Sequence, residues 1–476
     1  MRGESVTDNS LDYQGATIEE LSAMIAAEPE NETPYYYRAA AYCEQWQYEE
    51  AIMDYTTVLE MNSYHTDAYY HRAVVYAKLN MYDAVILDCS MALDIDPEYA
   101  GAYLERAAAY YEQQRYDKAV IDYGNFIQLR PEFAAAYDFR ASAYRALGEY
   151  EAAIADYSRA IELAPEAAGS YYQRAAVYRQ QLLYPAAIDD YTRVIELEPQ
   201  HADAYFNRGL VYDEQKQYQK ALADYQQTIA INLEYSGAYY HRAGIYCGQG
   251  DFESALADYS KVIELSPDDF GGYYRRGAVY QAQKRFRQAI ADYTRAIELE
   301  PELAACYYYR ATAYHELNCY QEAVGDYTRA IELEPRAIAY YYRAAVYREL
   351  DLLAEAITDY GQAISLEPAD ADYYFYRGSA YQQLGEHQQA VADYSRAIEL
   401  DAQAAVYHYR AECYYALGNY AAAITDYSRA IELEPDSAEA YYQRAMAYFA
   451  NRRFEEAMAD IDRAWEIDPA YGRTDG

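Results

Sequence analysis

Histidine and cysteine, which often carry catalysis, are few in this 476-residue sequence, and they do not form a catalytic or metal-binding motif. Seven histidines occur, and none has a nucleophile or a metal-ligating partner at motif spacing. Six cysteines are scattered without a Cys-x-x-Cys pair or a recurring spacing, which argues against a disulfide framework and a zinc site. The sequence also contains no glycine-rich phosphate-binding motif. We therefore expect no enzyme activity, no cofactor and no bound metal.

The chemistry that the sequence does offer is that of tyrosine. The chain has 66 Tyr, against 10 Phe and 2 Trp. A Tyr ring gives a large contact area at low side-chain entropy cost and carries a hydroxyl that needs a partner when it is buried. The composition is even from end to end. This evenness indicates one structural unit copied many times rather than the few ordinary domains that the length alone would predict.

The charge excludes two classes of partner. The chain has 78 Asp and Glu against 39 Lys and Arg, which gives a formal net charge of −39. Affinity for nucleic acid comes from basic side chains that displace counterions, so we expect no nucleic-acid partner. We also expect no membrane partner, because the sequence has neither a polybasic run nor a long apolar stretch. The start of the sequence lacks the apolar segment of a secretory signal, so we expect a reducing, cytoplasmic location.

The sequence repeats with a period of 34 residues. The segment that begins at Tyr137 aligns at this spacing with those that begin at Tyr171 and Tyr205, and the pattern extends over residues 32–471. Eleven repeats of 34 residues and two of 33 account for this span; the short ones lose a residue near Arg336 and near Gln403. We number the repeats from 1 to 13, and the positions within each repeat from its first residue.

The pattern within one repeat predicts two helices. Apolar or aromatic residues fall at positions 4, 8, 11, 17, 20, 21, 24, 27 and 28, which is helical spacing. Small residues at positions 8 and 20 allow two antiparallel helices to approach closely. Glycine in segments such as Leu147–Glu149 predicts a C-cap of the first helix, and Pro at position 32 ends the second. Because one helix pair cannot bury its apolar face alone, we expect the pairs to stack in series.

The consensus Tyr-x-x-Arg-Ala-x-x-Tyr…Leu-Gly-x-Tyr-x-x-Ala-Ile-x-Asp-Tyr-x-x-Ala-Ile-Glu-Leu-x-Pro resembles the tetratricopeptide repeat, a helix–turn–helix unit of 34 residues. The resemblance covers over nine-tenths of the chain, with Arg rather than the family's Leu at position 7. It implies an all-α fold, a right-handed α-solenoid superhelix of helix–turn–helix repeats. We expect a disordered tail at residues 1–15, a half-repeat helix at 16–31, thirteen repeats at 32–471 and a C-terminal tail at 472–476.

Residues that recur in every repeat are expected to serve the fold. Tyr at positions 4 and 11, Arg at position 7 and Asp at position 23 occur in all thirteen repeats. In antiparallel helices positions 7 and 23 lie at a similar level, so we predict an Arg–Asp ion pair within each repeat. The alternative is a pair that crosses to the next repeat.

Residues that could bind a partner are expected on the inner, concave surface. The family resemblance places positions 2, 5, 9, 12 and 13 of the first helix there. Position 5 is aromatic in ten repeats: Tyr36, Tyr70, Tyr172, Phe206, Tyr240, Tyr274, Tyr308, Tyr341, Phe375 and Tyr442. Position 12 holds Arg145, Arg179 and Arg348, which could pair with an acidic side chain or a C-terminal carboxylate of a partner. The alternatives are rings that pack partly against the neighbouring helix and arginines that are only solvated.

The sequence thus predicts a protein–protein interaction scaffold that binds peptide or protein segments of unknown identity in an aromatic-lined groove. Two alternatives stay open: a peptide-sensing regulatory subunit, and a substrate-recruiting subunit of a separate enzyme. At the C-terminal end, Ile461 and Trp465 either pack inward or form an end-to-end contact that would give weak self-association.

Overall fold

The structure is a computed structural model that describes residue 13 and residues 15–471. Over these residues the chain is helical, with 27 α-helices, one short 3-10 helix, η2, and no strand. The all-α fold predicted from the sequence is confirmed. The tails predicted at residues 1–15 and 472–476 lie outside the described part of the chain, apart from Tyr13 and Gly15.

The helices form two compact units, residues 1–238 and 239–476. The N-terminal unit contains α1 (Ile18–Ala27), α2 (Glu32–Glu44), α3 (Tyr48–Met61), α4 (Thr66–Lys78), α5 (Tyr82–Ile95), α6 (Ala100–Glu112), α7 (Tyr116–Leu129), α8 (Ala134–Leu147), α9 (Tyr150–Leu163), α10 (Ala168–Gln180), α11 (Tyr184–Leu197), α12 (Ala202–Glu214) and α13 (Tyr218–Ile231). The boundary falls within α14 (Ser236–Gln249). The C-terminal unit continues with α15 (Phe252–Leu265), α16 (Phe270–Ala282), α17 (Phe286–Leu299), α18 (Ala304–Glu316), α19 (Tyr320–Leu333), α20 (Ala337–Glu349), α21 (Leu353–Leu366), α22 (Ala371–Gln383), α23 (His387–Leu400), α24 (Ala404–Ala416), α25 (Tyr420–Leu433), α26 (Ala438–Ala450), α27 (Phe454–Ile467) and η2 (Pro469–Tyr471).

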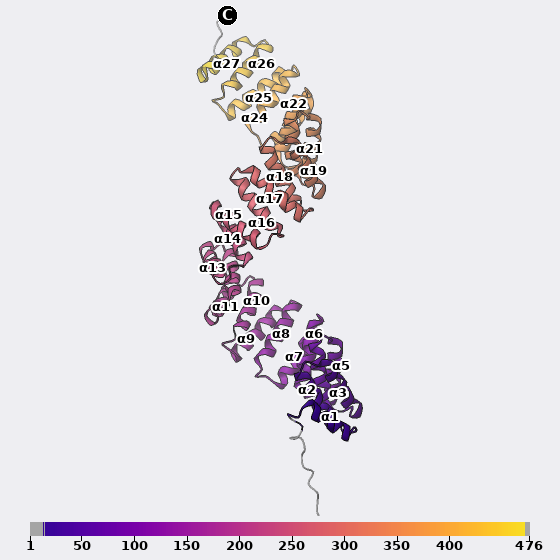
Figure 1. The fold of residues 1–476 in the computed structure, drawn as a ribbon. Helices are drawn as coiled ribbons and strands as arrows, with labels where there is room; N and C mark the ends of the chain where they lie inside the picture. The colour runs from indigo at the N-terminus through magenta and orange to yellow at the C-terminus, as the bar shows by residue number, and fades with distance from the viewer. Residues whose placement is uncertain (1–12, 14, 472–476) are drawn as a thin grey trace, which may run out of the picture. The chain divides into compact units, whose positions relative to one another are not determined.

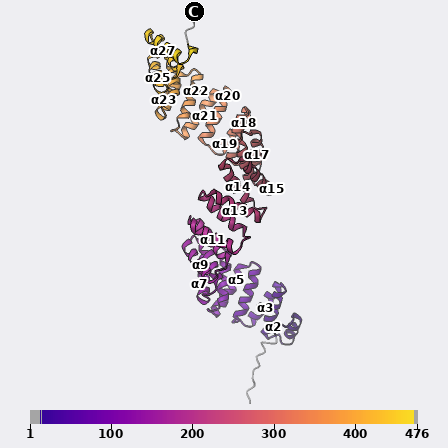
Figure 2. The same cartoon turned by 90° about the vertical axis from the view of Figure 1, so that its left-hand side faces the viewer.

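Within each unit, successive helices lie side by side in chain order (Figures 1 and 2). From α2 onward, each even-numbered helix is the first helix of a repeat and the following odd-numbered helix is the second, which gives thirteen helix pairs. The helix α1 precedes the first pair and packs against α2. It begins with a capping box, in which Thr17 accepts from the backbone N–H of Glu20 and the Glu20 carboxylate accepts in return.

Each pair packs closely because small residues face each other at positions 8 and 20. In repeat 4 these residues are Ala141 and Ala153, both fully buried beside the ring of Tyr157. In repeat 6, position 8 is Gly209, where a Cβ atom would lie 2.8 Å from Cε1 of the Tyr225 ring. A larger residue at position 8 would therefore force the two helices apart, which explains why only Ala and Gly occur there.

The turn inside each repeat requires a left-handed residue at position 15. In four repeats this residue is glycine, as at Gly148 with φ of 80°, which confirms the predicted glycine C-cap. The other nine repeats place an ordinary residue at positive φ: Trp46, Asn80, Gln114, Leu182, Lys216, Lys284, Asn318, Asp351 and Arg452. The turn is thus imposed by the helix packing even where the sequence does not favour it.

The two short repeats differ from the others only at their ends. The segments 334–336, between α19 and α20, and 401–403, between α23 and α24, have three residues where the other junctions have four. The helices on either side keep their usual lengths. The missing residues predicted near Arg336 and Gln403 are therefore absorbed by loops.

The Arg–Asp pair predicted within each repeat is present in all thirteen. Each position-7 guanidinium donates through Nε and Nη2 to both oxygens of the position-23 carboxylate, over 2.6 to 2.9 Å. The carboxylates are only 2% to 8% exposed. Such two-pronged pairing is the geometry that suits Arg and not Lys.

The same guanidinium also joins neighbouring repeats. In ten repeats its Nη1 donates to a Ser or Thr hydroxyl on the preceding helix, over 2.7 to 3.0 Å; that helix is α1 for repeat 1 and the second helix of the preceding repeat for the other nine. In repeat 5, the Arg174 guanidinium also lies 5.8 Å and 5.7 Å from the ring centroids of Tyr171 and Tyr178, at positions 4 and 11. The contacts of the position-7 Arg and of the tyrosines at positions 4 and 11 thus explain why these residues occur in every repeat: they stabilise the fold.

Candidate functional site

The ten aromatic residues at position 5, which we call the position-5 row, are all half-buried. In eight repeats the inner edge of this ring packs against the position-24 tyrosine of the same repeat; in repeats 2 and 13 position 24 is Cys89 and Ile461 instead. For example, the ring centroids of Tyr172 and Tyr191 lie 5.7 Å apart, and those of Tyr308 and Tyr327 lie 5.9 Å apart, both edge-on. Each ring therefore contributes to the core and also leaves part of its surface outside it.

Five rings of this row are covered by a second ring from the end of the same repeat. We call the last residue of a repeat, which directly precedes the next first helix, the junction residue. The covering pairs, with their centroid distances, are His65 on Tyr36 (5.1 Å), Tyr99 on Tyr70 (5.1 Å), His201 on Tyr172 (5.2 Å), Tyr235 on Phe206 (4.9 Å) and Tyr471 on Tyr442 (5.3 Å). An aromatic junction residue thus closes the space beside the position-5 ring.

Two of these junction rings are also held by a hydrogen bond. The hydroxyl of Tyr99 donates to Asp67, and that of Tyr235 donates to Asp203, each over 2.7 Å. Both carboxylates belong to position 2 of the same repeat. In these two repeats the position-2 carboxylate therefore holds the junction tyrosine in place over the position-5 ring.

A second aromatic row lies next to the first in the C-terminal unit. It consists of the position-6 residues Tyr309, Tyr342, Tyr376 and Tyr409 of repeats 9 to 12. Each contacts the position-5 ring of the preceding repeat, at centroid distances of 5.9, 6.0, 5.5 and 5.5 Å in that order. Each also stacks on the position-24 tyrosine of that repeat, at 6.1 to 6.4 Å. Sequence reasoning did not single out this row, because position 6 is not aromatic in most other repeats.

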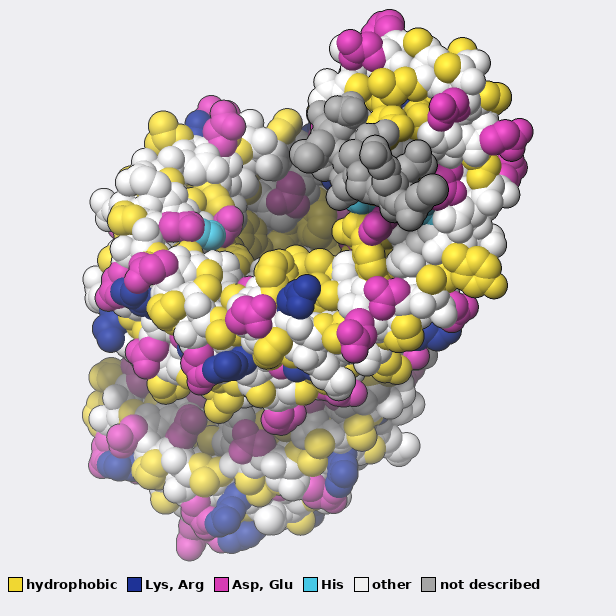
Figure 3. Space-filling model, turned by 90° about the horizontal axis from the view of Figure 1, so that it is seen from below, with side chains coloured by type: hydrophobic (Ala, Val, Ile, Leu, Met, Phe, Trp, Pro, Cys, Tyr) yellow, Lys and Arg dark blue, Asp and Glu magenta, His cyan; other side chains and the backbone are white. Residues whose placement is uncertain are grey.

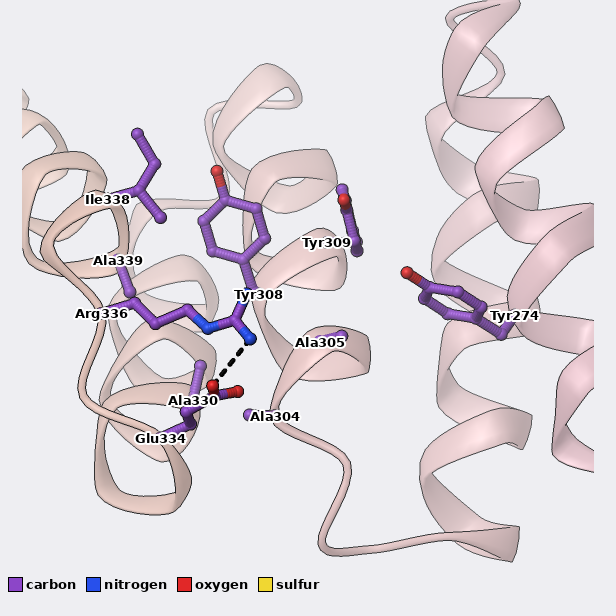
Figure 4. Close-up of a pocket in the computed structure, with 10 residues that line it drawn as sticks. All are labelled: Tyr274, Ala304, Ala305, Tyr308, Tyr309, Ala330, Glu334, Arg336, Ile338 and Ala339. Atoms are coloured by element: carbon purple, nitrogen blue, oxygen red, sulfur yellow. Dashed lines mark ion pairs between the residues drawn. The ribbon is translucent and has the colours of Figure 1, made fainter. Parts of the chain in front are cut away.

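A cavity of about 320 Å³ opens at the end of repeat 9 (Figure 4). Its lining residues are Tyr274, Ala304, Ala305, Tyr308, Tyr309, Ala330, Glu334, Arg336, Ile338 and Ala339. Two of them, Tyr274 and Tyr308, belong to the predicted position-5 row. Figure 4 shows the Tyr308 ring between Ile338 and Tyr309, with Tyr274 on the far side of Tyr309.

The junction residue at this cavity is Arg336, the N-cap residue of α20, and it carries no ring. Its guanidinium forms an ion pair with Glu334 at 2.7 Å (Figure 4). Both side chains are largely exposed, at 66% and 51%. The pair is therefore well solvated and holds the guanidinium at the rim only weakly.

A second cavity, of about 230 Å³, lies at the equivalent place in repeat 12, where the junction residue is Ser437. Its lining includes His408 and Tyr409 together with three acids, Glu412, Glu434 and Glu439. The Nε2 atom of His408 lies 3.5 Å from Glu412, and the hydrogen bond between them lowers the pKa of that carboxyl. Both cavities thus occur where the junction residue has no ring.

The three position-12 arginines contact neighbouring repeats. Arg145 donates to Gln173 over 2.8 Å, and Arg179 donates to Glu214 over 2.6 Å. The Arg348 guanidinium lies 5.6 Å from the Tyr376 ring centroid. None of the three is among the residues that line either cavity.

Burial changes the acidity of the tyrosine hydroxyls. Loss of solvation, reinforced by Asp67, raises the pKa of Tyr36 to about 12. Loss of solvation, reinforced by Tyr309, raises the pKa of Tyr274 to about 12. These hydroxyls are therefore neutral hydrogen-bonding groups near pH 7.

At the C-terminal end, Trp465 is 56% exposed and Ile461 is half-buried. Among the described residues, no group of three or more His, Cys, Asp or Glu is placed to hold a metal ion. No helix within residues 15–471 is long and apolar enough to cross a membrane.

These stacked helix pairs define a helical-repeat protein. Comparison of the sequence with protein-family models identifies the type of repeat. Models described as TPR repeat match residues 141–181, 183–215, 243–284, 344–385 and 412–452. Models described as tetratricopeptide repeat match residues 66–99, 102–132, 202–235, 272–303, 304–336, 371–403 and 438–471. The chain belongs to the tetratricopeptide repeat family, whose members generally act in protein–protein interaction.

A search of curated proteins gives no match. Among solved structures, the chain is 16% identical to one titled as the APC/C hetero-tetramer Cut9–Hcn1, over 97% of this chain and 91% of that one, with a TM-score of 0.34. It is 17% identical to yeast Tom70, over 78% and 92%, with a TM-score of 0.34. It is 20% identical to YrrB, titled as a TPR protein with an unusual peptide-binding site, over 44% and 92%, with a TM-score of 0.30.

The structure adds residues to the candidate site that sequence reasoning missed, chiefly Tyr309, Arg336 and Ile338. The signal was present in the sequence as the missing residue near Arg336. The effect of this missing residue depends on where the junction side chain points. The junction residue varies from repeat to repeat, so the repeated pattern does not predict its direction.

Proposed function

We propose that this protein binds extended peptide or protein segments along the face of its first helices that bears positions 2, 5, 9 and 12. These positions are three or four residues apart and therefore share one side of a helix. The observation that carries the proposal is the cavity at repeat 9, where partly exposed tyrosine rings surround a space that the chain itself does not fill. Its volume lies at the lower end of the range typical of ligand sites, about 300–1,000 Å³.

The chemistry of this face fits segments of another polypeptide. Tyrosine provides contact area with few rotatable bonds, so ordering it on binding costs little entropy. Position 9, beside the position-5 row, is small in many repeats, as at Ala40, Ala278 and Ala345, which leaves room next to each ring. No reacting group accompanies the rings, so the proposed role is to hold a segment and not to transform it.

The test uses two matched triple variants and a library of random 12-residue peptides displayed on phage. Peptides selected on the wild-type chain are measured against a blocked variant, Ala40→Arg, Ala278→Arg and Ala345→Arg, in which all three changes lie at half-buried position 9. The control carries Ala155→Arg, Ala291→Arg and Ala392→Arg, all at exposed position 22 of second helices. Both variants add the same charge and the same side chains.

We expect the selected peptides to bind the blocked variant at least about tenfold more weakly, because bulky charged groups would occupy the space beside the rings. Binding to the control should change by less than about twofold. Circular dichroism confirms that both variants remain helical. Equal affinity for the two variants, or a loss confined to the control, would contradict the proposal.

A further inference from the structure

Five repeats of the chain show which kind of side chain fits beside a position-5 ring. In repeats 1, 2, 5, 6 and 13 that place holds the aromatic ring of the junction residue, at centroid distances of 4.9 to 5.3 Å. Three of these rings are tyrosines and two are histidines. The arrangement recurs in both compact units, so it depends on the repeat and not on its place in the chain.

In repeat 9 this place is vacant. The junction has lost one residue, and its last residue, Arg336, forms an ion pair with Glu334 at the rim (Figure 4). The position-5 ring, Tyr308, and the position-6 ring, Tyr309, are retained and line the cavity. Tyr309 is 37% exposed and Ile338 is 38% exposed, so apolar surface remains accessible around the opening.

We propose that the repeat-9 cavity binds the ring of a phenylalanine from a partner's extended segment, in the place that the junction ring fills in other repeats. This proposal rests on the proposed function, since it assumes that a segment is held on this face. Position 2, which is an acid beneath Tyr99 and Tyr235, is Ala305 in repeat 9. The cavity thus lacks the acceptor that holds a tyrosine hydroxyl in those repeats, and a phenyl ring fits it without leaving a polar group unpaired.

The charge of the protein indicates that the residues flanking this phenylalanine are basic. The chain has a formal net charge of −39, and in Figure 3 Asp and Glu side chains are spread over the visible face with Lys and Arg among them. The equivalent cavity in repeat 12 is lined by three glutamates. At the repeat-9 cavity, Glu334 is half exposed and pairs with Arg336, so the charges at this rim balance locally. A basic segment is therefore complementary to the acidic surface around the cavity rather than to its rim.

The first experiment measures binding of the probe acetyl-Lys-Lys-Phe-Lys-Lys-amide, labelled as 4-fluorophenylalanine, to the full chain by fluorine NMR, and the affinity of each unlabelled peptide by its displacement of this probe. We expect it to bind at least about tenfold more tightly than the same peptide with Ala in place of Phe. It should also bind more tightly than the counterpart with Glu in place of each Lys. Equal affinity of the Phe and Ala peptides would overturn the proposal, and equal affinity of the Lys and Glu peptides would overturn its charge assignment.

The second experiment fills the cavity from within. Arg336→Tyr restores a junction ring and should weaken binding of the Phe probe at least about tenfold. Arg336→Gln removes the same charge without adding a ring and should keep affinity within about threefold. If the Gln variant loses binding as fully as the Tyr variant, the guanidinium and not the vacant space is the determinant, and the proposal is wrong.

The third experiment creates the same vacancy elsewhere. Tyr99→Ala removes the ring that covers Tyr70 in repeat 2. A probe that carries 4-benzoylphenylalanine should crosslink to Tyr308 or Tyr309 in the wild type, and additionally to Tyr70 in the variant. Absence of crosslinks around Tyr308 in the wild type would overturn the proposal.

The two proposals fail in different ways. If library peptides bind the first-helix face but do not respond to Arg336→Tyr, the cavity proposal fails and the proposed function stands. If the Phe probe crosslinks in the cavity while library peptides bind the Ala→Arg variants as tightly as the wild type, binding at the cavity stands and the proposed function of the whole face fails.

Discussion

The position-7 arginine is the residue on which the most interactions of a repeat converge. It binds the position-23 carboxylate with two hydrogen bonds and reaches the preceding helix with a third in ten cases, nine of them in the preceding repeat. In repeat 6 it also lies near the rings at positions 4 and 11. The ion pair was predictable, because both residues recur without exception along the chain. The third hydrogen bond was not, because its acceptor is a Ser or Thr on another helix pair, and which hydroxyl the Nη1 atom reaches depends on how neighbouring pairs pack.

The first prediction concerns this ion pair in repeat 6. Asp224 is 5% exposed and accepts two hydrogen bonds from Arg208, each of 2.8 Å. Asp224→Ala should destabilise the fold by about 3–5 kcal/mol, because it leaves a partly buried guanidinium without its counter-ion. The loss is measured by urea unfolding followed by circular dichroism.

Glu196→Ala provides the control for that measurement. Glu196 pairs with Arg193 at 3.0 Å, but both side chains are well exposed. Its removal should change stability by no more than about 0.2–0.5 kcal/mol. Similar effects of the two substitutions would show that the position-23 carboxylates do not anchor the repeat.

At the scale of the elements, the two helices of a repeat were predictable and the turn between them was only partly so. Helical spacing of the apolar positions, small residues at the helix contact and Pro after the second helix all follow from the repeated pattern. Positive φ at position 15 could be inferred from the sequence only where glycine occurs. At Leu182 or Lys216 nothing in the residue type indicates a left-handed backbone; the packing of the two flanking helices imposes it.

The second prediction follows from this turn. Leu182 has φ of 58° and is 67% exposed, so its side chain contributes little packing while its backbone is strained. Leu182→Gly should stabilise the protein by about 0.5–1 kcal/mol, since the relief of strain of about 1–2 kcal/mol exceeds the entropy cost of glycine. An upward shift of the urea midpoint would show this.

The reverse substitution tests the same argument. Gly148 has φ of 80° and no atom within 4 Å of an added Cβ, so Gly148→Ala is free of steric overlap and differs only in backbone preference. It should destabilise the protein by about 1 kcal/mol. A stabilising effect there would refute the argument for Leu182.

The candidate site also shows where prediction from a sequence ends. The position-5 row was found because its period matches the repeat and its residue type hardly varies. The cover over each ring was not found, because it comes from a junction residue that is His, Tyr, Phe, Ala, Leu, Arg or another type in different repeats. Whether a position-5 ring is exposed or covered depends on both the first helix that carries it and the loop that carries the junction residue. Their relative placement is known only from the structure.

At the scale of the whole molecule, the abundance of buried tyrosine links stability to alkaline pH. Burial raises the pKa of Tyr36 and Tyr274 to about 12, above the value of about 10 for a tyrosine in an unfolded chain. Burial also raises the pKa of Tyr157 and Tyr172. In all these residues the folded state holds the proton more tightly than the unfolded state.

The third prediction is therefore a loss of stability at high pH. The contribution of these hydroxyls is fully present below about pH 10 and is lost as pH rises from about 10 to 12, because the unfolded chain releases its protons first. The urea midpoint should fall across this window, together with delayed appearance of tyrosinate absorbance at the pH where unfolding begins. Smooth titration of all tyrosines with an ordinary pKa, with no change in the urea midpoint, would contradict the prediction.

The junction residue has a consequence for how such a chain diversifies. It lies between the helices of adjacent repeats, so exchanging it leaves the small residues at positions 8 and 20 and the Arg–Asp pair untouched. A gene that grows by copying a 34-residue segment can therefore open or cover the space beside each position-5 ring through single-codon changes between copies. Each new copy keeps the complete helix pair, and selection can change the access to its position-5 ring without changing the residues that stabilise the repeat.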